Sequence, residues 1–312
     1  MNSFRNIEWD AACEAAVLSL AVRDAGVIAA VPQVQGVYHQ LLGERHLAGL
    51  LHELHRRPAE LTRALRVACY ASAMAQALSW IGEVQRKRIV KAAILHRIGD
   101  ILFPETVPEE HPLKGLLVLD GVGDHDESVK QMVYQHRLSH GWVYPPARLL
   151  GLAAAFYELS AVMSYQEFIE QHYFLTPAVL PFRKKAPPPV LVVDDNLDLQ
   201  ELTSCMLARH GHQVLKASNG LEALQVWEQA PDALILSDVR MPGMNGLKFL
   251  ESLRARGGTN LFVFFSGELT REQAILMGQL GVFEFLEKGS SREVLETVRS
   301  ALAYRERMAD LN

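Results

Sequence analysis

Apolar residues follow two different spacings along this chain. Between about residues 8 and 175 they recur at every third or fourth position, as at Leu61, Leu65, Ala68 and Cys69. This spacing is typical of amphipathic helices. From residue 190 onward, short apolar runs alternate with amphipathic stretches. The pattern therefore predicts an all-α half followed by an α/β half.

The second half contains five predicted strand–helix pairs. We predict strands at 190–193, 213–217, 233–237, 261–265 and 282–286. The predicted helices cover 197–209, 219–229, 246–256, 271–279 and 291–308. Strands that alternate with helices form a parallel sheet covered by helices on both faces. We therefore expect a doubly wound, five-stranded parallel sheet here and a helical bundle before it.

A proline-rich stretch separates the two halves. Residues 176–189 contain five prolines, of which three are consecutive. Proline cannot continue a helix, and consecutive prolines favour extended polyproline backbone. We place the interdomain linker there, which gives a helical domain at 1–175, a linker at 176–189 and an α/β domain at 190–312.

Composition narrows the class of protein. With 312 residues, 49% hydrophobic and 21% charged, the chain is long and apolar enough for two folded domains. The net charge of −5 offers no basic field, so we expect neither nucleic acid nor an anionic membrane as partner. The three cysteines are far apart in sequence, which suits a reducing, cytoplasmic setting better than a disulfide framework or a cysteine metal site.

Charged residues also argue against membrane or secretory segments. The apolar stretch 15–31 carries Arg23 and Asp24 at its centre, which is costly in a bilayer. Arg5 and Glu8 precede any apolar run, so we expect no signal peptide.

Polar residues follow four of the five predicted strands. Asp194 and Asp195 end the first, Asp238 the third, Ser266 the fourth and Lys288 the fifth. Because ligands bind at the carboxyl ends of parallel strands, we expect these side chains to converge. Clustered carboxylates suit Mg²⁺, and a carboxylate beside it can attack phosphorus to form an acyl phosphate. The lysine would neutralise the developing charge and the serine would donate to a phosphoryl oxygen, whereas a solvated acidic loop would explain any one residue alone.

The motifs around these residues resemble the receiver domain of response regulators, a flavodoxin-like fold. The matching segments are VVDD at 192–195, SDVRMPGMNG at 237–246, FSG at 265–267 and LEK at 286–288. The resemblance implies a phosphoacceptor at Asp238 and Mg²⁺ held by Asp194, Asp195, Asp238 and the backbone carbonyl of Arg240. It also implies Ser266 and Phe285 as a switch pair.

The receiver resemblance carries partner expectations and one departure. It implies a sensor histidine kinase or phosphotransfer protein as phosphodonor, a downstream signalling protein and a homodimer. The usual Lys-Pro pair is Lys288-Gly289 here. The resemblance implies a cis peptide bond at that point, which costs about 3–4 kcal/mol without proline. We therefore expect a more mobile loop after the fifth strand.

Histidines concentrate in the helical half. Ten of the twelve precede residue 173, and they mark three clusters at 92–104, 111–115 and 133–145. Histidines from three helical segments can converge on a metal ion. The alternative is that these are ordinary polar or half-buried histidines with no metal. Their spacing alone favours this alternative.

The order and separation of these clusters resemble an HD-GYP domain, a helical, metal-dependent phosphodiesterase acting on cyclic di-GMP. The resemblance covers about 61–163, and His-Pro-x-x-Gly at 111–115 with Tyr-Pro at 144–145 favours this family over the related HDOD family, which lacks the catalytic His-Asp. Three histidines match ligand positions: His96, His111 and His136.

Other ligand positions of the family are changed. The His-Asp pair reads His96-Arg97, a later Asp falls on Ala154, and an early His falls near Arg63. The His-His-Glu triplet of the family reads Gln135-His136-Arg137. A two-metal site needs the bridging Asp to lower the pKa of bound water, but Arg97 puts a fixed positive charge there. Like charges about 4 Å apart cost on the order of 4 kcal/mol per unit pair at an effective dielectric of 20.

Two function hypotheses follow from the resemblances. In the first, phosphorylation of Asp238 controls a degenerate, non-hydrolytic HD-GYP-like domain that acts by binding protein or nucleotide, with a transition metal in the helical domain not expected. In the second, the receiver gates an active cyclic di-GMP phosphodiesterase. A single metal held weakly by the three histidines is the intermediate case. Metal content and cyclic di-GMP hydrolysis distinguish these hypotheses.

Overall fold

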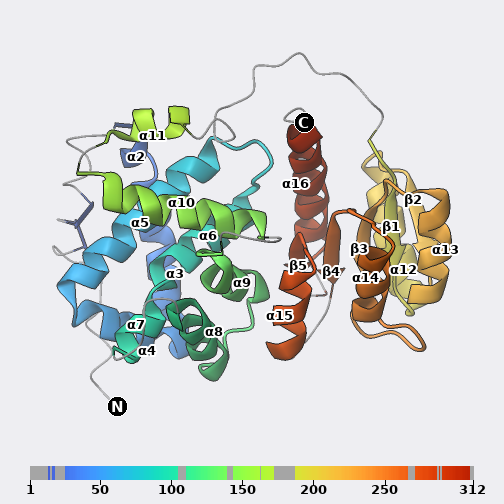
Figure 1. The fold of residues 1–312 in the computed structure, drawn as a ribbon, viewed down its shortest axis with the longest axis horizontal. Coiled ribbons are helices and arrows are strands. Elements are labelled where there is room, and N and C mark those ends of the chain that lie inside the picture. The colour runs from blue at the N-terminus through green and yellow to red at the C-terminus, as the bar shows by residue number, and fades with distance from the viewer. Residues whose placement is uncertain are drawn as a thin grey trace. The chain divides into compact units, whose positions relative to one another are not determined.

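A computed structural model of the chain describes residues 13–14, 16–17, 25–104, 110–138, 143–161, 163–171, 187–265, 271–286, 288 and 290–309. The chain divides into two compact units, Met1–Pro177 and Ala178–Asn312, and each is described by itself (Figure 1). Of the predicted linker, residues 176–186 lie outside the described part of the chain.

The first unit is helical throughout its described residues, as predicted. Its helices are α2 (Ala25–Ile28), α3 (Val31–Gly43), α4 (Arg45–His55), α5 (Pro58–Gln76), α6 (Glu83–Leu95), α7 (Ile98–Leu102), α8 (His111–Gly121), α9 (Glu127–Gln135), α10 (Pro145–Leu159) and α11 (Tyr165–Gln171). A proline occupies the first or second position of α3, α5, α8 and α10. Proline suits that position because its fixed φ is already helical and the missing N–H has no helical partner there.

Helix α5 is the centre of the helical unit. It packs most extensively against α6 and α10, which in turn contact α9. The stretch from Val67 to Ala75 is buried on every side. A helix that is apolar all round is expected in the middle of a core. Because α6, α8 and α9 end or begin at His96, His111 and His136, this packing also positions the three histidines.

Two glycines allow backbone segments that carry these histidines to pack unusually closely against neighbouring helices. A Cβ atom at Gly151 of α10 would lie 2.2 Å from the carbonyl oxygen of His136. A Cβ atom at Gly99 of α7 would lie 2.6 Å from the backbone nitrogen of Gly115 of α8. Both distances are below van der Waals contact, so any side chain there would push backbone segments apart.

We expect Gly151→Ala to destabilise the helical unit by about 1–3 kcal/mol, since overpacked cores lose stability of this order. Gly49→Ala is the matched control, because Gly49 lies inside α4 with nothing within 4 Å of its added Cβ. Alanine is the better helix former, so this control should gain up to about 1 kcal/mol. Urea unfolding followed by circular dichroism measures both, and equal midpoints for the two variants would contradict the close approach.

The second unit contains a five-stranded, all-parallel sheet in the order β2-β1-β3-β4-β5. The elements are β1 (Val190–Val193), α12 (Leu197–Arg209), β2 (Val214–Ala217), α13 (Gly220–Gln229), β3 (Leu234–Ser237), α14 (Gly246–Ala255), β4 (Phe262–Phe265), α15 (Arg271–Gln279), β5 (Glu284–Leu286) and α16 (Ser291–Ala309). The predicted doubly wound α/β sheet is confirmed. Strand β1 and helices α12 and α15 have the predicted bounds, and the other elements differ by one or two residues at an end.

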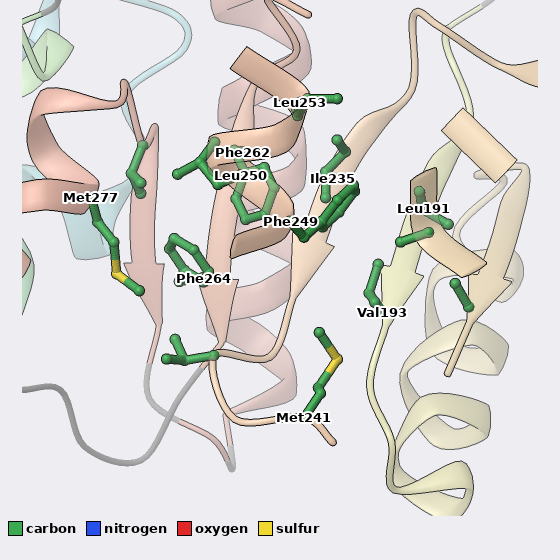
Figure 2. Close-up of a cluster of buried hydrophobic side chains, with 14 of the residues drawn as sticks. Leu191, Val193, Ile235, Met241, Phe249, Leu250, Leu253, Phe262, Phe264 and Met277 are labelled. Atoms are coloured by element: carbon green, nitrogen blue, oxygen red, sulfur yellow. The ribbon is translucent and has the colours of Figure 1, made fainter. Parts of the chain in front are cut away.

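The core of this unit lies between the sheet and its helices. Figure 2 shows Ile235 of β3 and Phe262 and Phe264 of β4 beside Phe249 and Leu250 of α14. All four residues of β1, β3 and β4 are buried, as expected for central parallel strands covered on both faces. The rigid central strands therefore fix the positions of the residues that follow them.

Among the described helices, none combines the length and the apolar character that a bilayer-spanning segment needs.

Candidate functional site

The carboxylates predicted to converge at the sheet edge lie together. Strands β1 and β3 are neighbours and pair Val193 with Ser237, so the residues that follow them emerge side by side. Asp194, Asp195 and Asp238 each offer an oxygen, and these oxygens lie within 4.8 Å of one another. Asp194 and Asp238 are buried and Asp195 is exposed, so the cluster opens to solvent on one side. This geometry suits an oxygen-ligated divalent cation.

Lys288 joins this acidic cluster from the segment after β5. Its Nζ atom lies 2.6 Å from Oδ2 of Asp238 and 3.0 Å from Oδ2 of Asp194. Burial acts to lower the pKa of the Lys288 ammonium, but the hydrogen bonds to Asp238 and Asp194 outweigh it and raise the pKa. The lysine therefore stays charged and reaches the acidic cluster although glycine follows it in sequence.

Backbone groups orient the two buried carboxylates. The N–H of Asn196 donates to Oδ1 of Asp194 at 2.9 Å, and the N–H of Val239 donates to Oδ1 of Asp238 at 2.6 Å. The Gln200 side chain of α12 donates to the carbonyl of Asp194 at 3.1 Å. The sequence reasoning missed Gln200, although a glutamine on the inward face of an amphipathic helix is a recognisable signal.

The structure describes two of the three other residues that the receiver resemblance implied, Phe285 and Arg240, but not Ser266. Phe285 is buried in β5 and its ring stacks on Phe264 with centroids 6.2 Å apart. Ser266 lies outside the described residues. The backbone N–H of Arg240 donates weakly to Oδ1 of Asp238, at 3.3 Å. The roles of the phosphoacceptor, the switch pair and the Arg240 carbonyl remain predictions.

A cavity of about 620 Å³ lies in the helical unit. Its lining comprises Arg63, His96, Arg97, Asp100, Pro104, His111, His136, Arg137, Gly151, Ala154, Ala155 and Glu158. The set includes Arg63, His96, Arg97, His111, His136, Arg137 and Ala154, which the sequence analysis compared with HD-GYP positions, but not Gln135. Residues up to 95 positions apart in the chain, Arg63 and Glu158, thus line one cavity.

Hydrogen bonds assign the ring nitrogens of the histidines. Nδ1 of His96 lies 2.7 Å from the carbonyl of Ala93, and Nδ1 of His136 lies 2.8 Å from the carbonyl of Val133. Each Nδ1 therefore carries a proton and donates, which leaves a lone pair on Nε2. Nε2 of His111 lies 3.1 Å from Nε2 of His136 and donates to it.

Burial keeps two of these rings neutral. Burial lowers the pKa of His96 well below its ordinary range, and the positive charges of Arg63 and Arg97 act in the same direction. Burial also lowers the pKa of His136 to about 3, assisted by His111, Arg137 and Arg97. Neutral imidazole with a protonated Nδ1 is the form in which Nε2 accepts a hydrogen bond.

Two neutral histidines predict a loss of stability in the helical unit as pH falls. Unfolded histidine has a pKa of about 6.5, so the unfolded chain takes up protons that the native rings refuse. Stability should therefore fall below about pH 6.5, by about 1.4 kcal/mol per pH unit for each ring, down toward the native pKa of His136 at about 3. Urea unfolding at pH 7 and pH 5 measures the slope, which His136→Gln should roughly halve. Equal stability at both pH values would contradict buried, neutral rings.

Two carboxylates in this cavity pair with arginines. Nη2 of Arg97 lies 2.6 Å from Oδ2 of Asp100, which is 4.0 Å from Nδ1 of His111. Arg63 pairs with Glu158. The sequence reasoning missed both acids. Glu158 lies four residues after Ala154 in α10, a spacing that repeats a helical face and could have indicated it. Asp100 lies in α7, after the break that follows α6, so helical spacing from His96 does not indicate it.

Comparison with known families finds one family match in each of the two units. Residues 190–299 match the response regulator receiver domain, and residues 61–157 match the HD domain. The protein PilH of Pseudomonas aeruginosa is 33% identical over 118 residues, which cover 36% of this chain and 97% of PilH. The sensor kinase/phosphatase CqsS of Vibrio cholerae is 29% identical over 109 residues, 34% of this chain and 16% of CqsS.

Two further proteins are similar to part of this chain. The CpxR homolog of Haemophilus influenzae, a transcriptional regulatory protein, is 45% identical over 65 residues, which cover 21% of this chain and 28% of that protein. The chemotaxis protein CheY4 of Vibrio cholerae, a solved structure, is 28% identical, covers 38% of this chain and 100% of its own, and has a TM-score of 0.36.

Proposed function

The chain belongs to the response regulators, with an HD domain ahead of its receiver domain, and we propose on this basis that phosphorylation of Asp238 controls a non-hydrolytic, HD-GYP-like binding domain. The observation that carries the proposal is the contact of Lys288 with both Asp238 and Asp194 beside Asp195. A receiver domain implies a histidine kinase or phosphotransfer protein as phosphodonor. Such a partner and a downstream signalling protein would meet this chain in the cytoplasm.

Magnesium fits the acidic cluster. Three carboxylates with oxygens within 4.8 Å repel one another, and one lysine neutralises only one charge. Asp194, Asp195 and Asp238, with the backbone carbonyl of Arg240, would hold the ion. When bound, Mg²⁺ neutralises phosphoryl oxygens and orients them.

The residues of the chain account for phosphoryl transfer. A carboxylate oxygen of Asp238 attacks the phosphorus of a phosphohistidine, so that a P–O bond forms and the P–N bond breaks. The electron pair stays on the departing imidazole. Lys288, already 2.6 Å from Asp238, would turn to the new phosphoryl group, and Ser266 would donate to one of its oxygens. Movement of Ser266 would be coupled to Phe285, which changes the surface that a partner contacts.

Loss of hydrolysis in the helical domain follows from the charge at Arg97. Its guanidinium lies in the cavity where HD-GYP domains have a metal-bridging carboxylate. It also forms an ion pair with Asp100, so this carboxylate is not free to bind a metal ion. Ala154 provides no ligand atom at a second position. A cation held among His96, His111 and His136 would therefore be repelled by a fixed positive charge. The nearby carboxylate of Asp100 is already paired with that charge.

An active, receiver-gated cyclic di-GMP phosphodiesterase is the second candidate. Asp100 favours it, because its carboxylate faces the same cavity as the three histidines. If Arg97 swung away, one acidic ligand would be restored. Two bound transition metals per chain together with linearisation of cyclic di-GMP would establish this candidate.

A pull-down that compares wild type with Asp238→Asn tests the proposed function. The full chain is treated with a small phosphodonor and Mg²⁺, and a partner is identified from a lysate of the host organism. We expect at least one partner whose recovery changes severalfold with phosphodonor in wild type and does not change in the variant. Identical recovery of every partner in all arms would overturn phosphorylation control of binding.

We expect the chain to form a homodimer through the face formed by α15, β5 and α16. Receiver domains commonly pair through this face, and Arg292 and Arg299 of α16 are exposed. Light scattering should give twice the chain mass at micromolar concentration. A monomer both with and without phosphodonor would contradict this prediction.

A further inference from the structure

One buried side chain is bonded to the backbone of the acidic cluster, and the proposed phosphoryl transfer does not use it. Gln200 lies in the first turn of α12 and is 7% exposed. It is the first residue of the buried face of that helix, which continues through Thr203, Ser204 and Leu207. A side-chain amide is costly to bury unless it finds hydrogen-bond partners. The partners of Gln200 therefore indicate its role.

The amide nitrogen of Gln200 bridges two backbone carbonyls. It donates to the carbonyl of Ala217 at 2.7 Å and to the carbonyl of Asp194 at 3.1 Å. Val193 of β1 and Ala217 of β2 form the last pair of their parallel register, and the N–H of Asp194 donates to the Ala217 carbonyl at 3.2 Å. Gln200 thus continues the hydrogen bonding between β1 and β2 past the ends of the strands.

The bond to Asp194 fixes the peptide group that joins Asp194 to Asp195. A peptide group is planar, so a bond that holds its carbonyl oxygen also sets the direction in which the chain enters the next residue. The Asp195 side chain is exposed and makes no hydrogen bond or ion pair within the part of the chain that the structure describes. Its direction therefore depends on its backbone rather than on partners of its own carboxylate.

The carboxylate of Asp194 is held differently. Its Oδ1 accepts from the N–H of Asn196 at 2.9 Å, and its Oδ2 accepts from Lys288 at 3.0 Å. These bonds orient the Asp194 side chain directly and do not pass through Gln200. Loss of the Gln200 amide should therefore act mainly on the placement of Asp195.

We propose that Gln200 is a positioning residue for Mg²⁺: its amide fixes the peptide group between Asp194 and Asp195 and so directs the Asp195 carboxylate toward Asp194 and Asp238. The inference rests on the proposed function, which assigns Mg²⁺ to these three acids. Mg²⁺ demands near-ideal octahedral geometry, so its affinity depends on the direction of each ligand. Mutation of groups that orient metal ligands typically changes metal affinity by about 10–100-fold.

Titration calorimetry with MgCl₂ on the full, unphosphorylated chain tests this role. Gln200→Met keeps a similar length and helix propensity but has no N–H donor. We expect it to bind Mg²⁺ about tenfold more weakly than wild type, at the lower end of the usual range because the amide acts on a ligand through the backbone. Asp195→Asn, which removes a ligand, should remove the same heat signal and so assigns it to the acidic cluster.

Asn260→Leu is the matched control. Asn260 is also a buried amide, and its Nδ2 donates to two backbone carbonyls, those of Pro231 at 2.9 Å and Ala233 at 2.7 Å. Both carbonyls precede β3, at the edge of the sheet opposite the acidic cluster. Removing this amide should lower the midpoint of thermal unfolding as Gln200→Met does, but Mg²⁺ should bind with wild-type affinity.

Two further measurements distinguish positioning from a general loss of structure. Labelling with acetyl phosphate at increasing Mg²⁺ should give Gln200→Met an about tenfold higher half-saturating Mg²⁺ concentration and the wild-type maximal rate. A merely structural role would lower the maximal rate instead. In wild type, the side-chain amide NMR signal of Gln200 should shift as Mg²⁺ is added, whereas that of the exposed Gln225 should not. The NMR measurement needs no variant.

The outcomes separate this inference from the proposed function. Wild type that neither binds Mg²⁺ nor becomes labelled in its presence would overturn the proposed function, and this inference with it. If wild type binds Mg²⁺, three results would overturn the positioning role alone: equal affinity of Gln200→Met, an equal loss of affinity in Asn260→Leu, or a Gln200 amide signal that does not move.

Discussion

Replacing Asp238 by asparagine should abolish labelling of the chain by a small phosphodonor. This carboxylate is the proposed nucleophile, and an asparagine amide oxygen at the same place does not form a stable acyl phosphate. Asp238 is 6% exposed, its Oδ1 accepts from the N–H of Val239, and its Oδ2 lies 2.6 Å from Lys288. An amide of the same size keeps the fold while it removes the reactive group.

The matched control for this prediction is Asp198→Asn. Asp198 is an exposed acid in the first turn of α12, close in sequence to the acidic cluster and outside it. Labelling with radioactive acetyl phosphate and Mg²⁺ should match wild type in this control, vanish in Asp238→Asn and fall to background in wild type after EDTA. Labelling of Asp238→Asn at the wild-type level would show that the phosphoacceptor is another residue.

The sequence predicted the α/β unit closely because its local signals agree with its fold. The helix bounds of α12 follow from the Asn196 cap, whose side chain accepts from the N–H of Leu199. Continuous apolar runs identify β1, β3 and β4 as buried strands, and strand order then brings Asp194 and Asp238 together. The end of β5 was predicted correctly, but its beginning was placed at 282, two residues before Glu284, because the apolar pair ahead of this buried acid reads as part of the strand.

The helical unit was predicted less completely, for a physical reason. Helical spacing says that a face is buried but not against which helix it packs. The resemblance to HD-GYP domains, rather than periodicity, singled out Arg63, His96 and Ala154, and these three residues line the same cavity. The pairing of Arg97 with Asp100 depends on side-chain directions after α6 ends, which no spacing specifies.

Wild-type protein should show no measurable hydrolysis of cyclic di-GMP with Mn²⁺, Fe²⁺ or Mg²⁺. The resemblance to HD-GYP domains places the Arg97 cation where that family has a metal-bridging carboxylate, and two like charges about 4 Å apart cost on the order of 4 kcal/mol at an effective dielectric of 20. Each divalent metal carries two such charges. Ala154, which also lines the cavity, removes a second acidic ligand.

The variant Arg97→Asp combined with Ala154→Asp should recover Mn²⁺ binding, because it removes the cation, adds two carboxylates and releases Asp100 from its ion pair. Arg97→Met is the control that removes the cation without adding a ligand, and it should bind Mn²⁺ at least tenfold more weakly than the double variant. Turnover need not return with the metal. Gln135 and Arg137 also depart from the family pattern, and Gln135 is committed to structure, since its Oε1 accepts from the N–H of Tyr144 at 2.7 Å. Robust wild-type hydrolysis that disappears in His96→Ala would show that three histidines and Asp100 suffice for this chemistry.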